Sequence, residues 1–249
     1  MRIILFAKRN AKEILRDPVN LFFGLGFPLI LLVMLSVINS SIPAEANNTM
    51  FSIENLAPGL AMFGTAFMAL FSGMLLSKDR TSSFLMRLFA SPMTSFDFIL
   101  GYTLPMIVMA SAQSAITLLA SCIMGLELTV NLLLAILVTT LTSLLFVGFG
   151  LLFGSLLDDK AVGGICGALL TNVAGWLSGV FIPIDLIGGA FKKAADILPF
   201  YHSVKAIQAV LHGNFGELLP HLTIVLGYSI VIFALAVIVF QRKMSGGKA

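Results

Sequence analysis

Charged residues are scarce in this chain of 249 residues. Asp, Glu, Lys and Arg together make up 11% of it, whereas 58% of the residues are hydrophobic. Soluble domains average about 25% charged and about 45–50% apolar residues. This gap is too wide for a larger soluble core to explain, so the composition excludes a soluble globular protein. No long basic face occurs outside the flanks of the apolar segments, which argues against a nucleic-acid partner.

The chain also lacks the short motifs that carry common enzyme chemistry. It has no GxxxxGK[ST] phosphate loop, no HExxH and no CxxC. We therefore expect no ATP, cofactor or metal to bind this chain by these routes. Its two cysteines, Cys122 and Cys166, both fall in apolar stretches. Burial in a packed interior is the favoured interpretation of both, ahead of a disulfide or a metal site.

What the sequence does contain is a series of apolar segments. Each is long enough to cross a bilayer, which takes about 20 residues of helix. We expect an all-α integral membrane protein, with one domain over residues 1–249 and six transmembrane helices. The expected spans cover residues 19–38, 56–76, 98–124, 132–157, 161–181 and 218–240.

Two further segments are expected to be helical without crossing the membrane. Residues 1–17 are amphipathic in a way typical of a helix in the membrane interface, although an ordinary core helix is the alternative. The apolar stripe is Ile3, Ile4, Ala7, Ala11, Ile14 and Leu15, and the polar face is Arg2, Lys8, Arg9, Lys12, Glu13 and Arg16. Residues 182–217 are half apolar and broken by Pro and Gly. They predict a re-entrant or outer hairpin of two short helices, over 185–197 and 200–211.

The distribution of basic residues sets the expected orientation. Six spans place both termini on the same side of the membrane. Lys192, Lys193 and Lys205 fall on the other side, which leaves twelve of the fifteen Lys and Arg residues on the side of the termini. Because basic residues accumulate on the inner side, we expect both termini to be cytoplasmic and the protein to be a multi-pass protein of the cell membrane.

Ionisable residues are missing from the centres of all six expected spans. Such residues usually mark proton relays or ion paths, and a proton-coupled carrier ordinarily needs one. The energy for any transport must therefore come from outside the membrane, or the protein is passive.

Neutral polar and small residues within the spans indicate helix contacts. Ser111, Gln113, Ser114 and Thr117 lie in the third span. Hydrogen bonding between helices is the favoured interpretation for them, and a substrate path is the alternative. In the fifth span a ridge of small residues recurs every four positions, at Gly163, Gly167, Thr171, Gly175 and Gly179. Such a ridge admits a close helix, from the same chain or from a second copy.

The most specific segment lies between the second and third spans, at residues 78–92. Phe84, Leu85, Leu88 and Phe89 share one face of a short helix there. That face could dock into a groove on another protein or lie on lipid. Periodicity alone leaves both interpretations open.

At this segment the sequence resembles the ABC-2 type transporter permeases, whose corresponding loop typically reads E-R-x-x-G-T-L-x-x-L-L-x-x-P. Asp79 and Arg80 match the acidic–basic pair, and Leu85, Leu88 and Pro92 match the apolar and proline positions. Phe84 and Arg87 resemble the residues at the corresponding positions of the loop in drug-exporter members. Ser83 departs from the family glycine. A second block, residues 180–202, is similar to the outer helices before the last span of the family.

The resemblance implies a half-transporter. Two such chains, a homodimer, would form the translocation path, with a separate ABC ATPase subunit carrying ATP and Mg²⁺ bound below each. A coupling helix over residues 82–90 would contact the ATPase. The residues implied in this coupling are Asp79, Arg80, Ser83, Phe84, Leu85, Arg87, Leu88, Phe89 and Pro92. The exported substrate would be amphiphilic: a drug, an antibiotic, a lipid or a lipid-linked glycan.

Two other functions remain open from the residues themselves. A passive channel or secondary carrier is compatible with the same apolar bundle. A membrane-embedded enzyme that uses His202 or His221 is the weaker alternative, because no carboxylate pair or nucleophile accompanies these histidines in the sequence.

Overall fold

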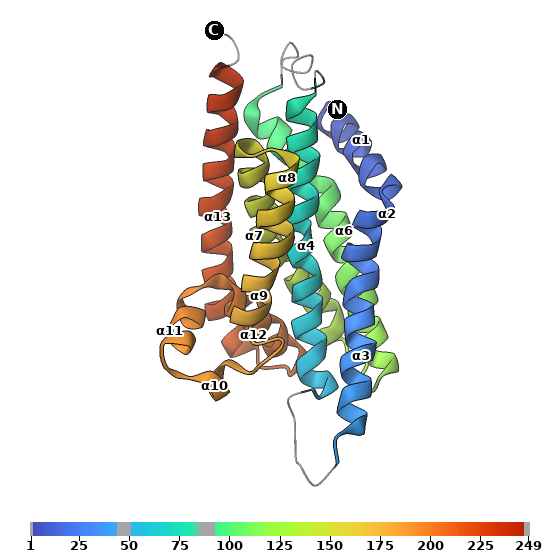
Figure 1. Ribbon diagram of the computed structural model, residues 1–249. Coiled ribbons are helices and arrows are strands. Elements are labelled where there is room, and N and C mark those ends of the chain that lie inside the picture. The colour runs from blue at the N-terminus through green and yellow to red at the C-terminus, as the bar shows by residue number, and fades with distance from the viewer. Residues whose placement is uncertain (1, 44–50, 83, 85–92, 247–249) are drawn as a thin grey trace.

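The computed structural model describes residues 2–43, 51–82, 84 and 93–246, and these residues form a bundle of helices without strands (Figure 1). Six helices in this described part are long and apolar enough to cross a membrane. They are Pro18–Ser41, Ile53–Thr81, Ser95–Ile123, Asn131–Leu156, Asp159–Leu177 and Phe215–Lys243. The protein is therefore a multi-pass membrane protein of the all-α class, as the sequence predicts.

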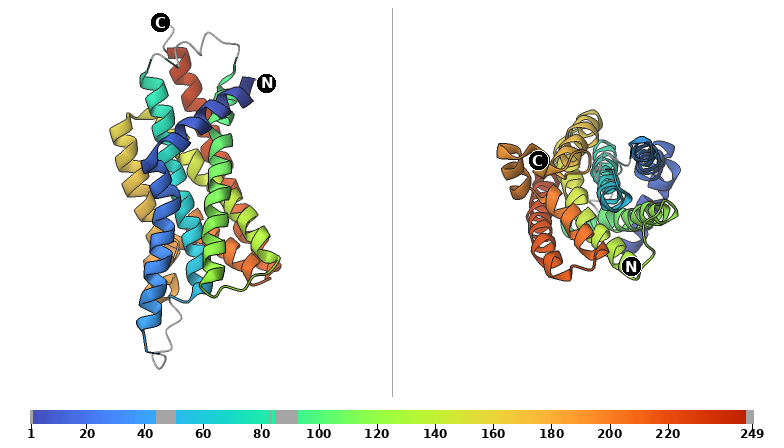
Figure 2. Two further views of the ribbon diagram at one scale, coloured as in Figure 1. Left: turned by 90° about the vertical axis from the view of Figure 1, so that its right-hand side faces the viewer. Right: turned by 90° about the horizontal axis from the view of Figure 1, so that it is seen from below.

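The first helix, α1 (Arg2–Arg16), runs obliquely across the end of the bundle at which the last helix also ends (Figure 2). It stops at Asp17, whose backbone is extended. The carboxylate of Asp17 accepts hydrogen bonds from the amides of Val19 and Asn20, at 3.0 and 3.3 Å. This N-cap, followed by Pro18 at the first helical position, turns the chain from α1 into the first span.

The first span is irregular near its beginning. It consists of α2 (Pro18–Leu21), a π-helical segment η1 (Phe22–Gly26) and α3 (Phe27–Ser41). The irregularity ends at Gly26, and Phe27 and Pro28 begin the regular helix. Pro28 has no amide hydrogen for the preceding turn, and the helix widens into η1 directly before it.

Helix α4 (Ile53–Thr81) is the centre of the bundle. In its most apolar window 89% of the residues are buried, against 22% in the first and last spans. It packs against α6 (Ser95–Ile123), against α3 and, most extensively, against α7 (Asn131–Leu156). Because α4 is enclosed by protein, polar groups on it find partners on its own backbone or on neighbouring helices rather than in water.

The contact between α4 and α7 is made by glycines. A Cβ atom at Gly150 would overlap the hydroxyl of Ser72 and the backbone carbonyl of Ala69. A Cβ atom at Gly154 would lie 2.5 Å from the carbonyl oxygen of Gly73. Only residues without a side chain allow the two backbones to come this close. The small residues of the fifth span stand out in the sequence because they recur every four positions, whereas these glycines of α4 and α7 form no such series.

The fifth span is less regular than expected. It consists of α8 (Asp159–Val162), a π-helical segment η3 (Gly163–Leu170) and α9 (Thr171–Leu177). The expected span of 161–181 extends too far, because the helix ends at Leu177. Gly179 lies beyond it with a φ of +82°, a conformation that glycine adopts without strain.

Only some of the five small residues of this span therefore lie on a packed helix face. An added Cβ atom at Gly167 would meet Leu70 of α4, and one at Gly175 would meet Phe181 and also Phe63 of α4. Thr171 is buried between them. Gly163 has no neighbour within reach of a Cβ atom in the described chain. Gly167, Thr171 and Gly175 thus pack inside this chain.

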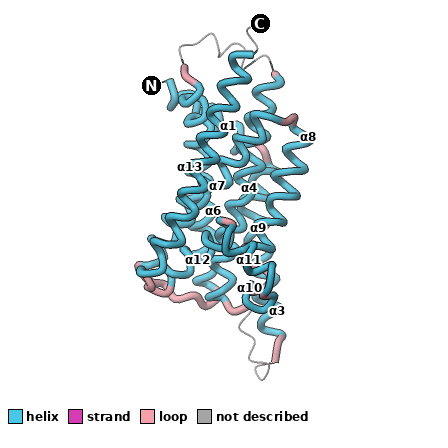
Figure 3. Tube along the Cα trace, turned by 90° about the vertical axis from the view of Figure 1, so that its left-hand side faces the viewer, coloured by secondary structure: helices cyan, strands magenta, loops and turns pink. Residues whose placement is uncertain are grey.

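The opposite end of the bundle holds the short helices (Figures 1 and 3). They are α10 (Ile184–Ile187), α11 (Gly189–Ile197) and α12 (Pro199–Leu211), followed by the long α13 (Phe215–Gly246). The single helix expected over 185–197 is wrong. Gly188 and Gly189 have φ values of +63° and +56°, and this left-handed pair divides it into two. Helix α12 packs against α7 and α13.

The glycine contact between α4 and α7 generates a stability prediction. Gly150→Ala should destabilise the protein by about 1–3 kcal/mol, because the new methyl group meets backbone and must push the helices apart. Gly227→Ala in α13 is the matched control, since a Cβ atom there has nothing within 4 Å. Unfolding of both variants in detergent measures the difference. Equal stabilities would contradict the close contact.

Candidate functional site

Helix α1 is anchored on α6 by a buried face that differs from the expected stripe. Phe6, Ala7, Asn10 and Ile14 are the buried residues of α1. The rings of Phe98 and Tyr102 on α6 meet Phe6 edge-on, with centroids 5.7 and 5.0 Å away. The face that packs inward is thus rotated from the predicted one. Of the expected stripe, Ile4 and Leu15 are exposed.

A proline in α6 explains the buried amide of Asn10. Pro105 lies inside α6 and lacks the N–H that would bond to the carbonyl of Gly101, four residues earlier. The side-chain amide of Asn10 donates a hydrogen bond to this carbonyl oxygen at 3.1 Å. Asn10 is completely buried. An acceptor left without a partner by Pro105 is thus satisfied from another helix.

A buried carboxylate joins three helices at the same level. Arg9 of α1 donates two parallel hydrogen bonds to Asp79 in the last turn of α4, at 2.5 and 2.8 Å. The hydroxyl of Tyr102 on α6 donates a third to Asp79, at 2.8 Å. Asp79 is 3% exposed, so its charge depends on these donors. We call Arg9, Asn10, Asp79, Gly101 and Tyr102 the α1 junction.

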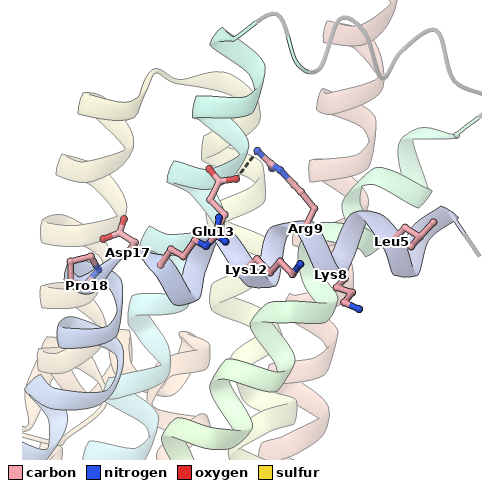
Figure 4. Close-up of a pocket in the computed structure, with 8 residues that line it drawn as sticks. Leu5, Lys8, Arg9, Lys12, Glu13, Asp17 and Pro18 are labelled. Carbon is pink, nitrogen blue, oxygen red and sulfur yellow. Dashed lines mark ion pairs between the residues drawn. The ribbon is translucent and has the colours of Figure 1, made fainter.

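The electrostatics of Arg9 follow from its neighbours. Partial burial by itself would lower the pKa of Arg9, but the hydrogen bond and charge of Asp79 raise it above its ordinary value, and the charge of Glu13 adds to this. Figure 4 shows Arg9 and Glu13 paired on one side of α1, with Nη2 and Oε2 2.6 Å apart. Arg9 is therefore a partly buried positive charge held at the end of α4, whereas the sequence pattern predicts it on the water-facing side.

Phe84 connects the α1 junction to the segment between the second and third spans. Its ring lies over the guanidinium of Arg9, 4.3 Å from centroid to Cζ. Phe84 is half-buried against the same apolar cluster that holds Phe6 and Tyr102. A displacement of Phe84 would therefore act directly on the group that holds Asp79.

The other side of the end of α4 is tied to α7. The hydroxyl of Ser77 and the guanidinium of Arg80 both donate to the carbonyl oxygen of Leu157, at 2.8 and 2.6 Å. Leu157 is the C-cap residue of α7, so this carbonyl lies at the end of that helix. The last turn of α4 thus contacts α1, α6 and α7 through directional bonds.

Of the nine residues expected to couple this chain to an ATPase, three are described by the structure and six are not. Asp79 and Arg80 lie on α4 itself, not in a loop, and both point into the bundle. Phe84 contacts Arg9 as described. The remaining members lie outside the described residues; they are Ser83, Leu85, Arg87, Leu88, Phe89 and Pro92.

The neutral polar residues of α6 lie among helix contacts. Gln113, Ser114 and Thr117 are buried, and the amide of Gln113 donates to the hydroxyl of Thr117 at 3.1 Å. Ser111 shares a hydrogen bond of 3.1 Å with Thr140 of α7. Their placement favours hydrogen bonding between and within helices over a substrate path.

The two histidines considered for an enzyme do meet at the opposite end. The Nδ1 atoms of His202 on α12 and His221 on α13 are 2.8 Å apart. Nε2 of His202 lies 2.8 Å from the carbonyl oxygen of Asp196. In this hydrogen bond one Nδ1 donates and the other accepts, according to the tautomers of the two rings. The pair fastens α12 to α13.

Sequence reasoning missed Arg9, Asn10 and Tyr102 as members of a site. One signal was available, because Asn10 follows Phe6 by four residues and precedes Ile14 by four. Placing Phe6 at the centre of the buried face puts Asn10 on that face too. A proline within a span, Pro105, was the second signal, since it leaves a carbonyl that needs a donor.

Because Arg9 and Asp79 form an ion pair, we expect the stability losses of their single substitutions not to add up in the double variant. Arg9→Leu leaves the carboxylate of Asp79 buried without its counter-charge and should cost about 3–5 kcal/mol of stability. The double variant Arg9→Leu/Asp79→Leu removes both charges and should lose less than Arg9→Leu alone. Arg16→Leu, an exposed basic residue of the same helix, is the control. Unfolding in detergent measures each, and additive losses would rule out the pairing.

The hydrogen bond of Asn10 predicts a rescue. Asn10→Leu leaves the carbonyl of Gly101 without a donor and should cost about 1–3 kcal/mol. Pro105→Ala supplies the missing backbone N–H, so it should restore stability in the Asn10→Leu protein more than it changes the parent. A double-mutant cycle of unfolding free energies tests this. A zero interaction energy would mean that Asn10 does not replace the helix hydrogen bond.

Comparison with known families identifies the family to which this chain belongs. Residues 1–212 match the family described as ABC-2 type transporter, a range that includes the whole α1 junction and residues 82–90. No curated protein sequence matched the chain. The family match covers well over half of the chain, and the six membrane-crossing helices agree with it. The chain therefore belongs to the ABC-2 type transporter family, as a permease component of a membrane transport system.

Proposed function

We propose that this chain is the membrane subunit of an ATP-binding cassette exporter and receives its energy at Phe84. The observation that carries the proposal is the stacking of Phe84 on Arg9, which is itself bonded to Asp79. In this proposal a separate ATPase subunit, which carries ATP and Mg²⁺, contacts residues 82–90. Both termini then lie in the cytoplasm, and the membrane is the cell membrane.

The α1 junction gives this contact a route into the bundle. Movement of residues 82–90 displaces Phe84 and with it Arg9. Because Arg9 is joined to Asp79 on α4, and Asp79 to Tyr102 on α6, these helices respond together. Arg80 extends the connection to the end of α7. Transport then follows from a shift between two packings of the helices, with nucleotide favouring one of them.

The composition of α4, the central helix, supports an external energy source. In the described part of the chain the ionisable residues of α4 lie in its first and last turns. A carrier driven by protons ordinarily has such a group at mid-membrane. We further propose that two copies form the path and that the cargo is amphiphilic, such as a drug, an antibiotic, a lipid or a lipid-linked glycan.

A substitution at Phe84 tests the route. Phe84→Ala should leave the ATPase subunit bound to the permease but abolish the stimulation of its ATP hydrolysis by the permease in proteoliposomes. Phe96→Ala is the matched control, an exposed aromatic residue on α6 close to the same end. Leu88→Asp, on the proposed contact itself, should instead abolish co-purification of the two subunits.

Each outcome bears on a different part of the proposal. Full stimulation in Phe84→Ala would show that coupling bypasses the α1 junction. Normal assembly in Leu88→Asp would argue against residues 82–90 as the contact. Transport by the purified permease in liposomes without any ATPase would favour a passive channel or a secondary carrier.

A further inference from the structure

An apolar groove lies beneath α1. Its volume is about 510 Å³, within the range of about 300–1,000 Å³ that is usual for ligand sites. Helix α1 lines it with Ala7 and Ala11, and α6 lines it with Leu104, Val108 and Ala112. Val108 is 69% exposed. The groove is thus open and apolar, and it lies between α1 and the helices of the bundle that α1 crosses.

An open basic cleft lies around the outer surface of α1, and its described lining comes from this helix and from the Asp17–Pro18 turn that follows it. It has a volume of about 770 Å³ and is lined by Lys8, Lys12 and Arg16, together with Arg9, Glu13 and Asp17. The last three are engaged: Arg9 pairs with Asp79 and Glu13, and Asp17 caps α2. Lys8, Lys12 and Arg16 are exposed, and none has an acidic partner among the described residues. The cleft therefore keeps a positive charge.

One side chain, that of Lys8, lines both the apolar groove and the basic cleft. Figure 4 shows Lys8 on the side of α1 opposite to Arg9 and Glu13. An occupant that reaches from one space to the other must be apolar along its length and negatively charged at its end.

We propose that this groove is a binding site for one anionic phospholipid. An acyl chain lies beneath α1 along α6, and the phosphate is held by the ammonium groups of Lys8 and Lys12. Charge complementarity selects the anionic lipid, because a zwitterionic head group would bring its own ammonium group to these lysines. Burial of the methylene groups of the acyl chain supplies the remainder of the affinity. The site is independent of the function proposed above.

Native mass spectrometry of the purified, delipidated chain tests this site. The chain is titrated with an equimolar mixture of phosphatidylglycerol and phosphatidylcholine, and the first bound lipid is identified by mass. A basic side chain near an anionic lipid contributes roughly a fivefold preference. We expect phosphatidylglycerol to be favoured at least about fivefold, and Lys8→Ala/Lys12→Ala to remove this preference.

Matched controls separate a site from general attraction. Arg242→Ala/Lys243→Ala removes the same charge from exposed positions at the same end of the bundle and should keep the preference. Ala112→Phe fills the groove without changing charge and should lose the bound lipid. Ala168→Phe, at an exposed alanine of the fifth span, should retain it.

The same measurements can overturn the proposal. A preference that survives Lys8→Ala/Lys12→Ala, or that falls equally in Arg242→Ala/Lys243→Ala, would mean attraction to overall charge and no site beneath α1. Lipid binding unchanged by Ala112→Phe would show that the groove holds no acyl chain. Melting temperatures of all variants, compared with the parent, establish that the differences do not arise from unfolding.

Discussion

The carboxylate of Asp79 sets a requirement that the surrounding structure has to meet. A charge this deeply buried is costly unless several donors surround it. Those donors come from α1 and α6, through Arg9 and Tyr102. If either helix left α4, the carboxylate would lose a hydrogen-bond donor. The position of α1 across the end of the bundle is therefore determined by electrostatics as much as by its apolar face.

A second requirement arises in α6. Pro105 removes one hydrogen bond from that helix, and Asn10 replaces it from α1. Phe6 then packs at Gly101, where a Cβ atom would collide with its ring. A charge, an amide and a ring on one face of α1 are thus all matched by features of α4 and α6. This matching distinguishes α1 from an amphipathic helix that is held only by lipid.

The sequence predicts the general fold well and the junction poorly, for physical reasons. Long apolar segments such as 132–157 are unambiguous because only a bilayer or a large core can cover them. The pattern of residues 1–17 predicts a helix, but it does not tell which polar residue turns inward. That depends on Asp79, 70 positions away from Arg9. Similarly, a ridge of small residues is visible at Gly163–Gly179, yet the tighter contact is at Gly150, whose partner on α4 cannot be identified from spacing alone. The role of residues 82–90 remains a prediction.

The glycine contact has a consequence for how the bundle can move. Since the backbones of α4 and α7 touch at Gly73, Gly150 and Gly154, neither helix can slide or rotate against the other without a collision. A conformational cycle that keeps this contact moves the two helices as a single rigid body. The displacement is then taken up at less extensively packed boundaries, such as that of the first span, whose most apolar window is only 22% buried. Gating would take place at the periphery of the bundle, around an unchanging centre.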